Sequence, residues 1–360
     1  MTLFQMRRRL NSARHGGWLC KLLSQVALSG TLILLAAVTR AADVDAARQI
    51  AARTELHLIQ TLTLTDRDFL LGDASRGAPV VISGELRIAQ GTGRLPLVIL
   101  QHGSSGIAAN IDVWSRELNA IGISSFVLDG FTGRGLTEVN TNQAALGRLN
   151  LILDIYRALD VLANNPRVDP NRIALMGFSR GGQATLYASL KRFHRMWNRS
   201  GIEFTAYIPF YPDCMTTYLQ DTDTADRPIR IFGGAADDYN PLAVCKAYVQ
   251  RLKNADHDVD VTEYPGAAHA FDNPLGAHPP IVQSKFETVR NCQIREQSDG
   301  SLINVATGQP FTYKDVCVEH GPHLGYDPAA NEEARSSVKK FLTTIFKNNQ
   351  IAPDTSMSAK

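Results

Sequence analysis

The chain has 360 residues, of which 44% are hydrophobic and 20% are charged, a composition typical of a globular protein with a substantial core. Its formal net charge of +2 is unevenly distributed, because residues 1–41 hold six basic residues and no acidic one. The remaining chain has 31 basic against 35 acidic residues, a net charge of −4, so its charge gives no argument for nucleic-acid binding.

Residues 1–41 have the parts of a secretory signal peptide: a basic front, an apolar stretch at 26–38 and a small-residue end. We expect cleavage after Ala41, a periplasmic or secreted protein, and no membrane association once the leader is removed. The alternative is an uncleaved anchor, although the apolar stretch is shorter than the ~18 residues of a membrane span. The arginines at 7–9 leave twin-arginine export open as a second route.

Strand and helix patterns alternate along the rest of the chain. Residues 56–64 and 79–88 alternate apolar and polar side chains, which predicts exposed antiparallel edge strands. Residues 95–100 form a continuous apolar run, as expected of a strand buried on both faces. Further strands are expected at 124–129, 173–176, 204–210, 228–232 and 259–264, and helices up to about 120 and at 142–164, 183–190, 242–252 and 329–346.

This alternation predicts a mostly parallel, doubly wound sheet flanked by helices, in one domain of residues 42–350. Residues 284–326 break the rhythm, because they are polar and carry turn signals and two cysteines. We expect this late insertion to form a disulfide-pinned hairpin or lid. Residues 351–360 are expected to be a flexible tail.

The strand at 173–176 runs into G-x-S-x-G at residues 177–181, and a helix pattern follows. Strand, G-x-S-x-G and helix in this order put a serine on a sharp, strained turn with its hydroxyl exposed, so Ser179 is the candidate nucleophile. The alternative is an ordinary glycine-rich loop. At this point the chain resembles the α/β-hydrolase superfamily.

A serine nucleophile needs a base and a group that orients the base, and in this fold they follow in the order Ser, Asp or Glu, His. Asp237 comes after a strand and four residues before a proline that starts the next helix, and we prefer it to the adjacent Asp238, which is expected to cap that helix. His269, on the small-residue loop after the last strand, is the candidate base. The candidate oxyanion-hole donors are the backbone N–H groups of Arg180 and Ser104.

Four cysteines follow the leader, and four allow three pairings. We expect disulfides Cys214–Cys245 and Cys292–Cys317, because each encloses a compact local segment; free buried thiols are the alternative. No metal or cofactor is expected.

Several stretches together resemble the dienelactone hydrolase family. They are residues 103–106, 129–135, 211–214, 234–241 with Cys245, and 268–272, so the resemblance spans roughly residues 95–272 and the last helix. That family typically has a cysteine nucleophile and is shorter, without a leader or the 284–326 insertion. The resemblance therefore implies the fold and a hydrolytic triad more strongly than a lactone substrate. Arg134 and Arg180 could meet a substrate carboxylate, but Arg134 could equally fix its own loop to a neighbouring acid.

The sequence thus predicts an exported serine hydrolase that cleaves small carboxylic esters or lactones through an acyl-enzyme. A peptidase or acyl transferase could use the same triad. A catalytically silent binding protein on the same scaffold is the hypothesis from another class.

Overall fold

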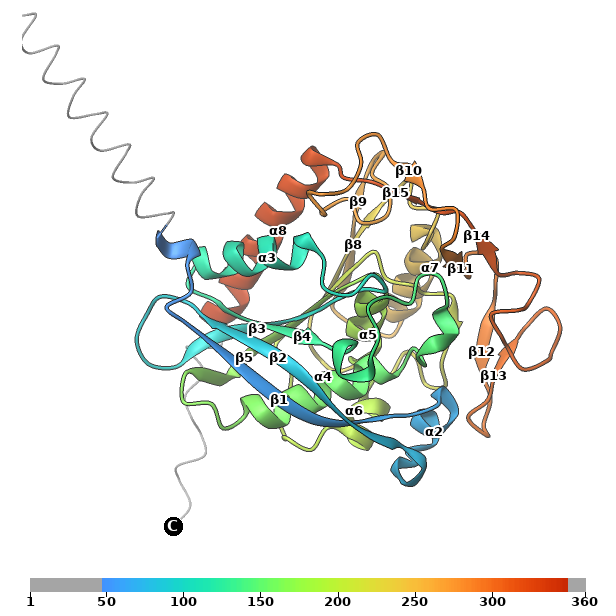
Figure 1. The fold of residues 1–360 in the computed structure, drawn as a ribbon, viewed down its shortest axis with the longest axis horizontal. Coiled ribbons are helices and arrows are strands. Elements are labelled where there is room, and N and C mark those ends of the chain that lie inside the picture. The colour runs from blue at the N-terminus through green and yellow to red at the C-terminus, as the bar shows by residue number, and fades with distance from the viewer. Residues whose placement is uncertain (1–46, 349–360) are drawn as a thin grey trace, which may run out of the picture. The chain divides into compact units, whose positions relative to one another are not determined.

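The computed structural model describes residues 47–348, so the predicted leader and the predicted tail at 351–360 lie outside the described residues. One eight-stranded sheet runs through this part of the chain (Figure 1). Across the sheet its strands are β1 (Arg53–Thr63), β2 (Ala78–Ile88), β4 (Ser124–Asp129), β3 (Leu95–Gln101), β5 (Val168–Phe178), β6 (Tyr207–Phe210), β8 (Ile229–Gly234) and β9 (Val259–Tyr264). The six strands from β4 to β9 are parallel, whereas β2 is antiparallel to both of its neighbours. The predicted α/β-hydrolase fold with a mostly parallel sheet is confirmed.

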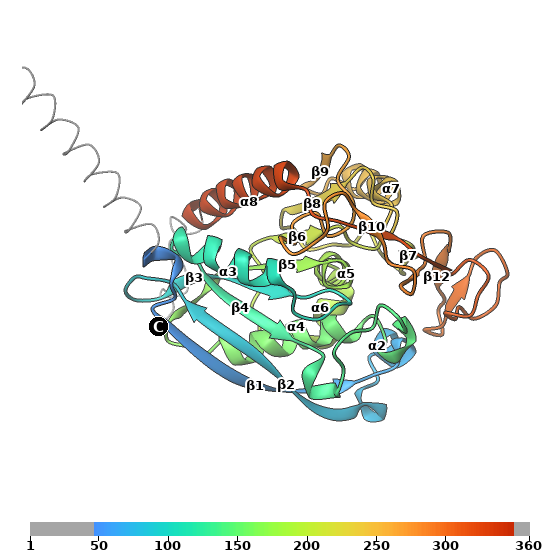
Figure 2. The same cartoon turned by 45° about the horizontal axis from the view of Figure 1, so that its top comes forward.

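Helices cover both faces of the sheet. One face packs against α3 (Ala109–Ala120) and α8 (Pro328–Asn348), which lie side by side in both views (Figures 1 and 2). The other face packs against α4 (Asn150–Leu162), α5 (Arg180–Tyr187), α6 (Lys191–Trp197) and α7 (Leu242–Asn254). The short α2 (Asp66–Leu71) follows β1. Within residues 47–348, no helix combines the length and apolar character needed to cross a membrane.

The continuous apolar run in β3 packs into the hydrophobic cores on both faces of the sheet. Leu97 and Ile99 pack on the side of α4, and Val98 and Leu100 pack on the side of α3, all four with no exposed surface. Burying each such side chain contributes about 1.5–3 kcal/mol. A strand covered on both faces has no alternating solvent-facing positions, which is why the run at 95–100 does not alternate.

Two expectations about secondary structure are wrong. β2 is not an edge strand, because it lies between β1 and β4. Its alternating pattern reflects a sheet region that is covered on one face only. The helix predicted from residue 142 begins at Asn150; the earlier residues form a 3₁₀ turn, Gln143–Ala145, and a loop.

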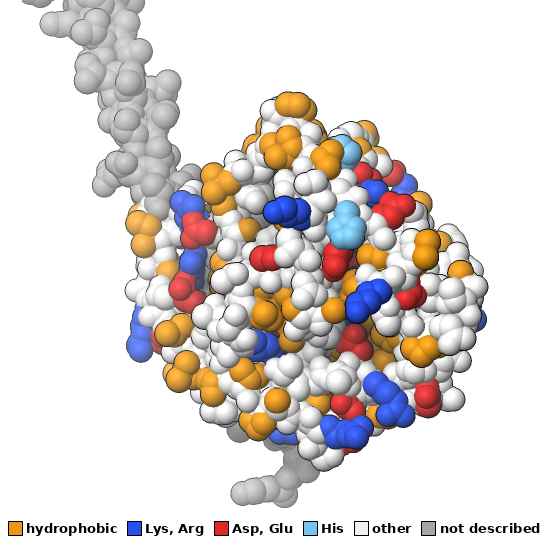
Figure 3. Space-filling view, turned by 45° about the vertical axis from the view of Figure 1, so that its right-hand side comes forward, with side chains coloured by type: hydrophobic (Ala, Val, Ile, Leu, Met, Phe, Trp, Pro, Cys, Tyr) orange, Lys and Arg blue, Asp and Glu red, His pale blue; other side chains and the backbone are white. Residues whose placement is uncertain are grey.

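The late insertion consists of short ladders. β10 (Ile281–Val282) pairs with β15 (His323–Leu324), β11 (Glu287–Thr288) pairs with β14 (Glu319–His320), and β12 (Ile294–Glu296) pairs with β13 (Leu302–Asn304) and with β7 (Thr216–Thr217). Disulfides join Cys214 to Cys245 and Cys292 to Cys317, so the predicted pairing is confirmed. On the face drawn in Figure 3, acidic and basic side chains are interspersed.

Candidate active site

Ser179 lies at the junction of β5 and α5 in a strained backbone conformation. Its φ of 55° and ψ of −116° are rare for a residue with a side chain, and α5 begins at the next residue. Two glycines make the junction sterically possible. A Cβ atom at Gly177 would lie 2.2 Å from the carbonyl oxygen of Gly181, and one at Gly181 would lie 2.3 Å from that of Gln101. The G-x-S-x-G spacing therefore reflects the close approach of α5 to β5 and β3.

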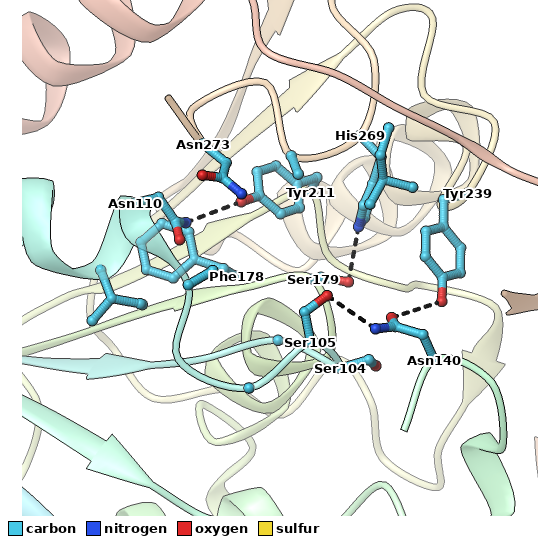
Figure 4. A pocket seen from close by; sticks show the side chains of 16 residues that line it. Ser104, Ser105, Asn110, Asn140, Phe178, Ser179, Tyr211, Tyr239, His269 and Asn273 are labelled. Carbon is cyan, nitrogen blue, oxygen red and sulfur yellow. Dashed lines mark hydrogen bonds between the residues drawn. The ribbon is translucent and has the colours of Figure 1, made fainter. Parts of the chain in front are cut away.

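Asp237 and His269 lie on the loops that follow β8 and β9. Nδ1 of His269 lies 2.8 Å from Oδ2 of Asp237, and Nε2 of His269 lies 2.9 Å from Oγ of Ser179 (Figure 4). Because a carboxylate only accepts hydrogen bonds, Nδ1 carries the proton and Nε2 accepts from the serine hydroxyl. The other carboxylate oxygen of Asp237 accepts from the backbone N–H groups of Tyr239 and Asn240, both at 2.9 Å. The structure thus brings the three predicted triad residues into one chain of hydrogen bonds.

Asp238, the competing acid, binds the insertion instead of His269. Its carboxylate accepts from the backbone N–H of His323 at 2.7 Å, from Nδ1 of His323 at 2.8 Å and from Arg290 at 3.2 Å. Partial burial opposes ionisation, but the hydrogen bonds from His323 and the nearby charges hold the pKa of Asp238 below its ordinary value. The expected capping role is wrong, because Pro241 occupies the N-cap of α7 and no side chain caps that helix.

The loop after β3 brings the backbone of Ser104 close to the serine turn. A Cβ atom at the preceding Gly103 would lie 3.1 Å from Cβ of Ser179. In residues 47–348, neither the backbone N–H of Ser104 nor that of Arg180 donates a hydrogen bond. Both N–H groups are therefore available to a ligand atom beside Ser179, as an oxyanion hole requires.

His102 fixes this loop. Its side chain is buried, its Nε2 accepts from the backbone N–H of Gly130 at 3.1 Å, and its Nδ1 lies 2.8 Å from the carbonyl oxygen of Gly103. Burial lowers the pKa of His102, so the neutral ring that these contacts require is favoured.

A pocket of about 490 Å³, open to solvent, lies over Ser179 and His269 (Figure 4). Two of its walls are the rings of Tyr211 and Tyr239, each with its centroid 4.7 Å from that of the His269 ring. Tyr239 could have been found from the sequence as an aromatic residue two positions after the candidate acid. The aromatic walls confine the imidazole on two sides.

Three asparagines that the sequence did not single out line the pocket: Asn110, Asn140 and Asn273. They lie near the start of α3, in the loop before α4 and in the loop after β9, where no pattern in the sequence distinguishes them. Asn140 donates to Oγ of Ser105 at 2.9 Å and accepts from the Tyr239 hydroxyl at 3.3 Å (Figure 4).

A buried carboxylate supports the wall formed by Tyr211. Asp272 accepts from the hydroxyl of Tyr211 at 2.6 Å, from Nε1 of Trp114 at 2.7 Å and from Nδ2 of Asn110 at 3.2 Å. Burial raises the pKa of Asp272 despite these three donors. The loop that carries His269 is therefore fixed from behind, three residues further along the chain.

Arg134 does not line the pocket, and the structure supports its alternative role. Its guanidinium is nearly buried and binds both carboxylate oxygens of Asp154, at 2.6 and 2.9 Å. The side chain of Arg180 is also committed, since it donates to the side chain of Gln143 at 2.7 Å and to the carbonyl oxygen of Leu146. Neither arginine is placed to receive a substrate carboxylate in the pocket.

The insertion contributes to the site at two points. Leu324 lines the large pocket, while Glu287 and Thr288 line a smaller pocket of about 290 Å³ that also reaches Ser179. Glu287 accepts from the backbone N–H of Gln143 at 2.7 Å. The segment predicted as a hairpin or lid thus forms part of the walls around the serine.

In the described part of the chain, no three His, Cys, Asp or Glu side chains gather as a metal site would need. His323 binds Asp238 through Nδ1.

Comparisons with known proteins agree with this architecture. The model of the dienelactone hydrolase family matches residues 83–346. A dienelactone hydrolase-like promiscuous phosphotriesterase, P91 from metagenomic libraries, is 16% identical with a TM-score of 0.51, over 81% of this chain and 98% of that chain. A structure called m3DLH is 17% identical, with the same TM-score and coverage. A putative dienelactone hydrolase from Klebsiella pneumoniae is 19% identical over 61% of this chain and 89% of its own, with a TM-score of 0.44. No curated protein matches the sequence.

Proposed function

The chain belongs to the dienelactone hydrolase family of carboxylic ester hydrolases, and on this premise we propose that it cleaves esters or lactones with Ser179 as nucleophile, His269 as base and Asp237 as the orienting acid. The observation that carries the proposal is the unbroken hydrogen-bonded chain from the Ser179 hydroxyl through the imidazole to the Asp237 carboxylate, with separations of 2.9 and 2.8 Å. A serine hydroxyl is a weak nucleophile, and an adjacent oriented base is what activates it.

The reaction then proceeds in two halves. Oγ of Ser179 attacks the ester carbonyl carbon while Nε2 of His269 takes the hydroxyl proton, and the backbone N–H groups of Ser104 and Arg180 stabilise the oxyanion. The tetrahedral intermediate expels the alcohol, which receives the proton from Nε2, and an acyl-enzyme remains. Water, deprotonated by His269, attacks the acyl carbon and releases the carboxylic acid and the free serine.

A series of p-nitrophenyl esters from acetate to decanoate tests the proposal on wild type and Ser179→Ala. We expect Ser179→Ala to lose about ten-thousandfold or more in kcat, and to lose labelling by a phosphonate probe, with unchanged circular dichroism. His269→Ala should behave in the same way. Folded wild-type protein that neither turns over any ester nor takes up the probe would refute the enzyme reading and favour a binding protein.

We also propose that residues 1–41 are a cleaved leader and that residues 42–350 form the catalytic domain outside the cytoplasm. Two disulfides support this location, because such bonds persist mainly in oxidising compartments. Mass spectrometry of the exported protein should find Ala42 as the first residue. An intact leader in a membrane fraction would favour the anchor instead.

A further inference from the structure

The pocket over Ser179 is polar but carries no full charge on its walls. Within residues 47–348, no Lys, Arg, Asp or Glu side chain lines it. Around Ser179 and His269, its hydrogen-bonding side chains are those of Ser104, Ser105, Asn110, Asn140, Tyr211, Tyr239 and Asn273. Carboxamides and hydroxyls can bind a neutral polar group, but none of them supplies the charge that a buried carboxylate needs.

The nearest cations, Arg148 and Arg180, line the smaller adjoining pocket together with two acids, Asp213 and Glu287. Arg148 forms a salt bridge with Asp213, and the guanidinium of Arg180 donates to Gln143 and Leu146. The nearest charge behind His269 is negative, because the Asp237 carboxylate lies 2.8 Å from its imidazole. An anionic substrate would therefore lose hydration in this pocket without gaining a counter-ion.

Two groups at the pocket keep hydrogen-bonding capacity for a ligand. Oγ of Ser105 accepts from Asn140, which leaves its own O–H to donate, and Ser105 is exposed to solvent (Figure 4). Asn273 uses its oxygen to accept from the backbone N–H of Leu275, and among residues 47–348 its amide nitrogen makes no hydrogen bond. Both can donate to the oxygen of a hydroxyl, ether or amide.

From this lining we infer that the substrate is an uncharged ester with a hydrogen-bonding substituent, such as a hydroxyl or an amide, near the scissile bond. The inference rests on the proposed function and specifies its substrate class. Esters that carry a free carboxylate are disfavoured by the same walls, because the large pocket offers them donors without a cation. Purely aliphatic esters leave the donors of Ser105 and Asn273 to water and gain no hydrogen bond from them, so they should bind less favourably than a polar ester.

Three methyl esters of matched length test the inference on the acyl side: methyl succinamate, methyl pentanoate and monomethyl succinate, which are neutral polar, apolar and anionic. A matching set of acetates with a hydroxyl, methyl or carboxylate terminus tests the alcohol side. At pH 7.5 we expect kcat/KM for the neutral polar ester to exceed that for the anionic one by about tenfold or more in both sets. The neutral polar ester should also exceed the apolar one in at least one set.

Substitutions of Asn273 change the charge at the rim without touching the triad. Asn273→Lys should raise the ratio of anionic to neutral kcat/KM by about fivefold, and the near-isosteric Asn273→Asp should lower it. Because each ratio is taken within one variant, a general loss of activity cancels. Identical ratios in the two variants would show that the rim does not sense substrate charge and would overturn the inference.

Failure of the inference is distinguishable from failure of the proposed function. Ser179-dependent turnover of p-nitrophenyl acetate, with anionic or aliphatic methyl esters preferred, overturns the substrate class and leaves the esterase standing. Loss of all Ser179-dependent turnover overturns both.

Discussion

The buried pair Arg134–Asp154 allows a sharp test of the role of Arg134. The sequence left two roles open for this residue, a substrate contact and an anchor of its own loop, and the structure supports the second. The guanidinium makes five hydrogen bonds, two of them to Asp154 and the others to Oγ1 of Thr63 and the carbonyl oxygens of Leu62 and Gly130. Asp154 has no exposed side-chain surface, and its remaining side-chain donor is the hydroxyl of Thr61 at 2.9 Å. Arg134→Met therefore leaves a buried carboxylate without its cation.

Breaking a buried ion pair in this way costs about 3–5 kcal/mol. For a domain of this size, that corresponds to a fall in melting temperature on the order of 10 °C. Urea unfolding followed by tryptophan fluorescence measures the loss. The double variant Arg134→Met/Asp154→Asn removes the stranded charge, so it should recover at least half of the stability lost in the single variant.

The pH dependence of this loss provides an internal check. Burial already raises the folded-state pKa of Asp154 above its ordinary value of 3.8, although Arg134 opposes the effect. Without the cation that pKa rises further. Since an acid with a raised folded pKa destabilises the fold as pH rises from its unfolded value, the deficit of Arg134→Met should be larger at pH 8 than at pH 5. A variant with wild-type stability at both pH values and a raised KM would refute the structural role and restore Arg134 as a substrate contact.

Three further predictions concern the insertion and the acid loop, which is the loop after β8 that carries Asp237 and Asp238. Asp237→Asn should lower kcat by about ten-thousandfold, whereas Asp238→Asn, its neighbouring control, should lower it by less than about tenfold, and equal losses would contradict the assigned roles. The pKa of Asp238 is held below 3.8, so its contacts with His323 should stabilise the fold fully above that pH and lose this effect as pH falls through the lowered pKa. The stabilities of wild type and Asp238→Asn, followed by acid titration, should therefore converge at low pH. Replacing Cys292 and Cys317 with serine opens a bridge across 25 residues and should cost up to about 3 kcal/mol on calorimetry, with KM raised more than kcat is lowered; an unchanged KM would separate the insertion from the site.

The sequence predicted the positions of the sheet strands along the chain well, because core packing leaves a direct record in apolar patterns. The run at β3 does not alternate since Leu97 and Val98 enter different cores. The same reasoning wrongly predicted β2 to be an edge strand. Alternation reports how many faces of a strand are covered, and β2 is covered on one face although strands pair along both of its edges.

The start of α4 could not be read from local pattern either. Residues from 142 onward include apolar positions at helical spacing, yet the helix begins at Asn150. The side chain of Asn150 accepts from the backbone N–H of Leu64 and donates to its carbonyl oxygen, both at 2.8 Å. A long-range contact to the end of β1 thus fixes the boundary, and the preceding loop is released to bring Gln143 toward Arg180.

The candidate triad was predictable because its three residues follow a fixed order at the ends of strands. The pocket walls were not, because Asn110, Asn140 and Asn273 come from three loops whose meeting depends on the tertiary fold.

The acid loop connects the insertion to the candidate active site. Adjacent residues on it bind two partners: Asp237 hydrogen-bonds to His269, and Asp238 binds His323 and Arg290 of the insertion. Leu324, the neighbour of His323, forms a backbone bridge with His269 and lines the large pocket. A movement of the insertion would therefore disturb the proposed base, the proposed acid and a pocket wall together. The candidate triad must hold its hydrogen bonds near 2.8 Å to be effective. An insertion that is closed by a disulfide fits this requirement better than a loose lid would.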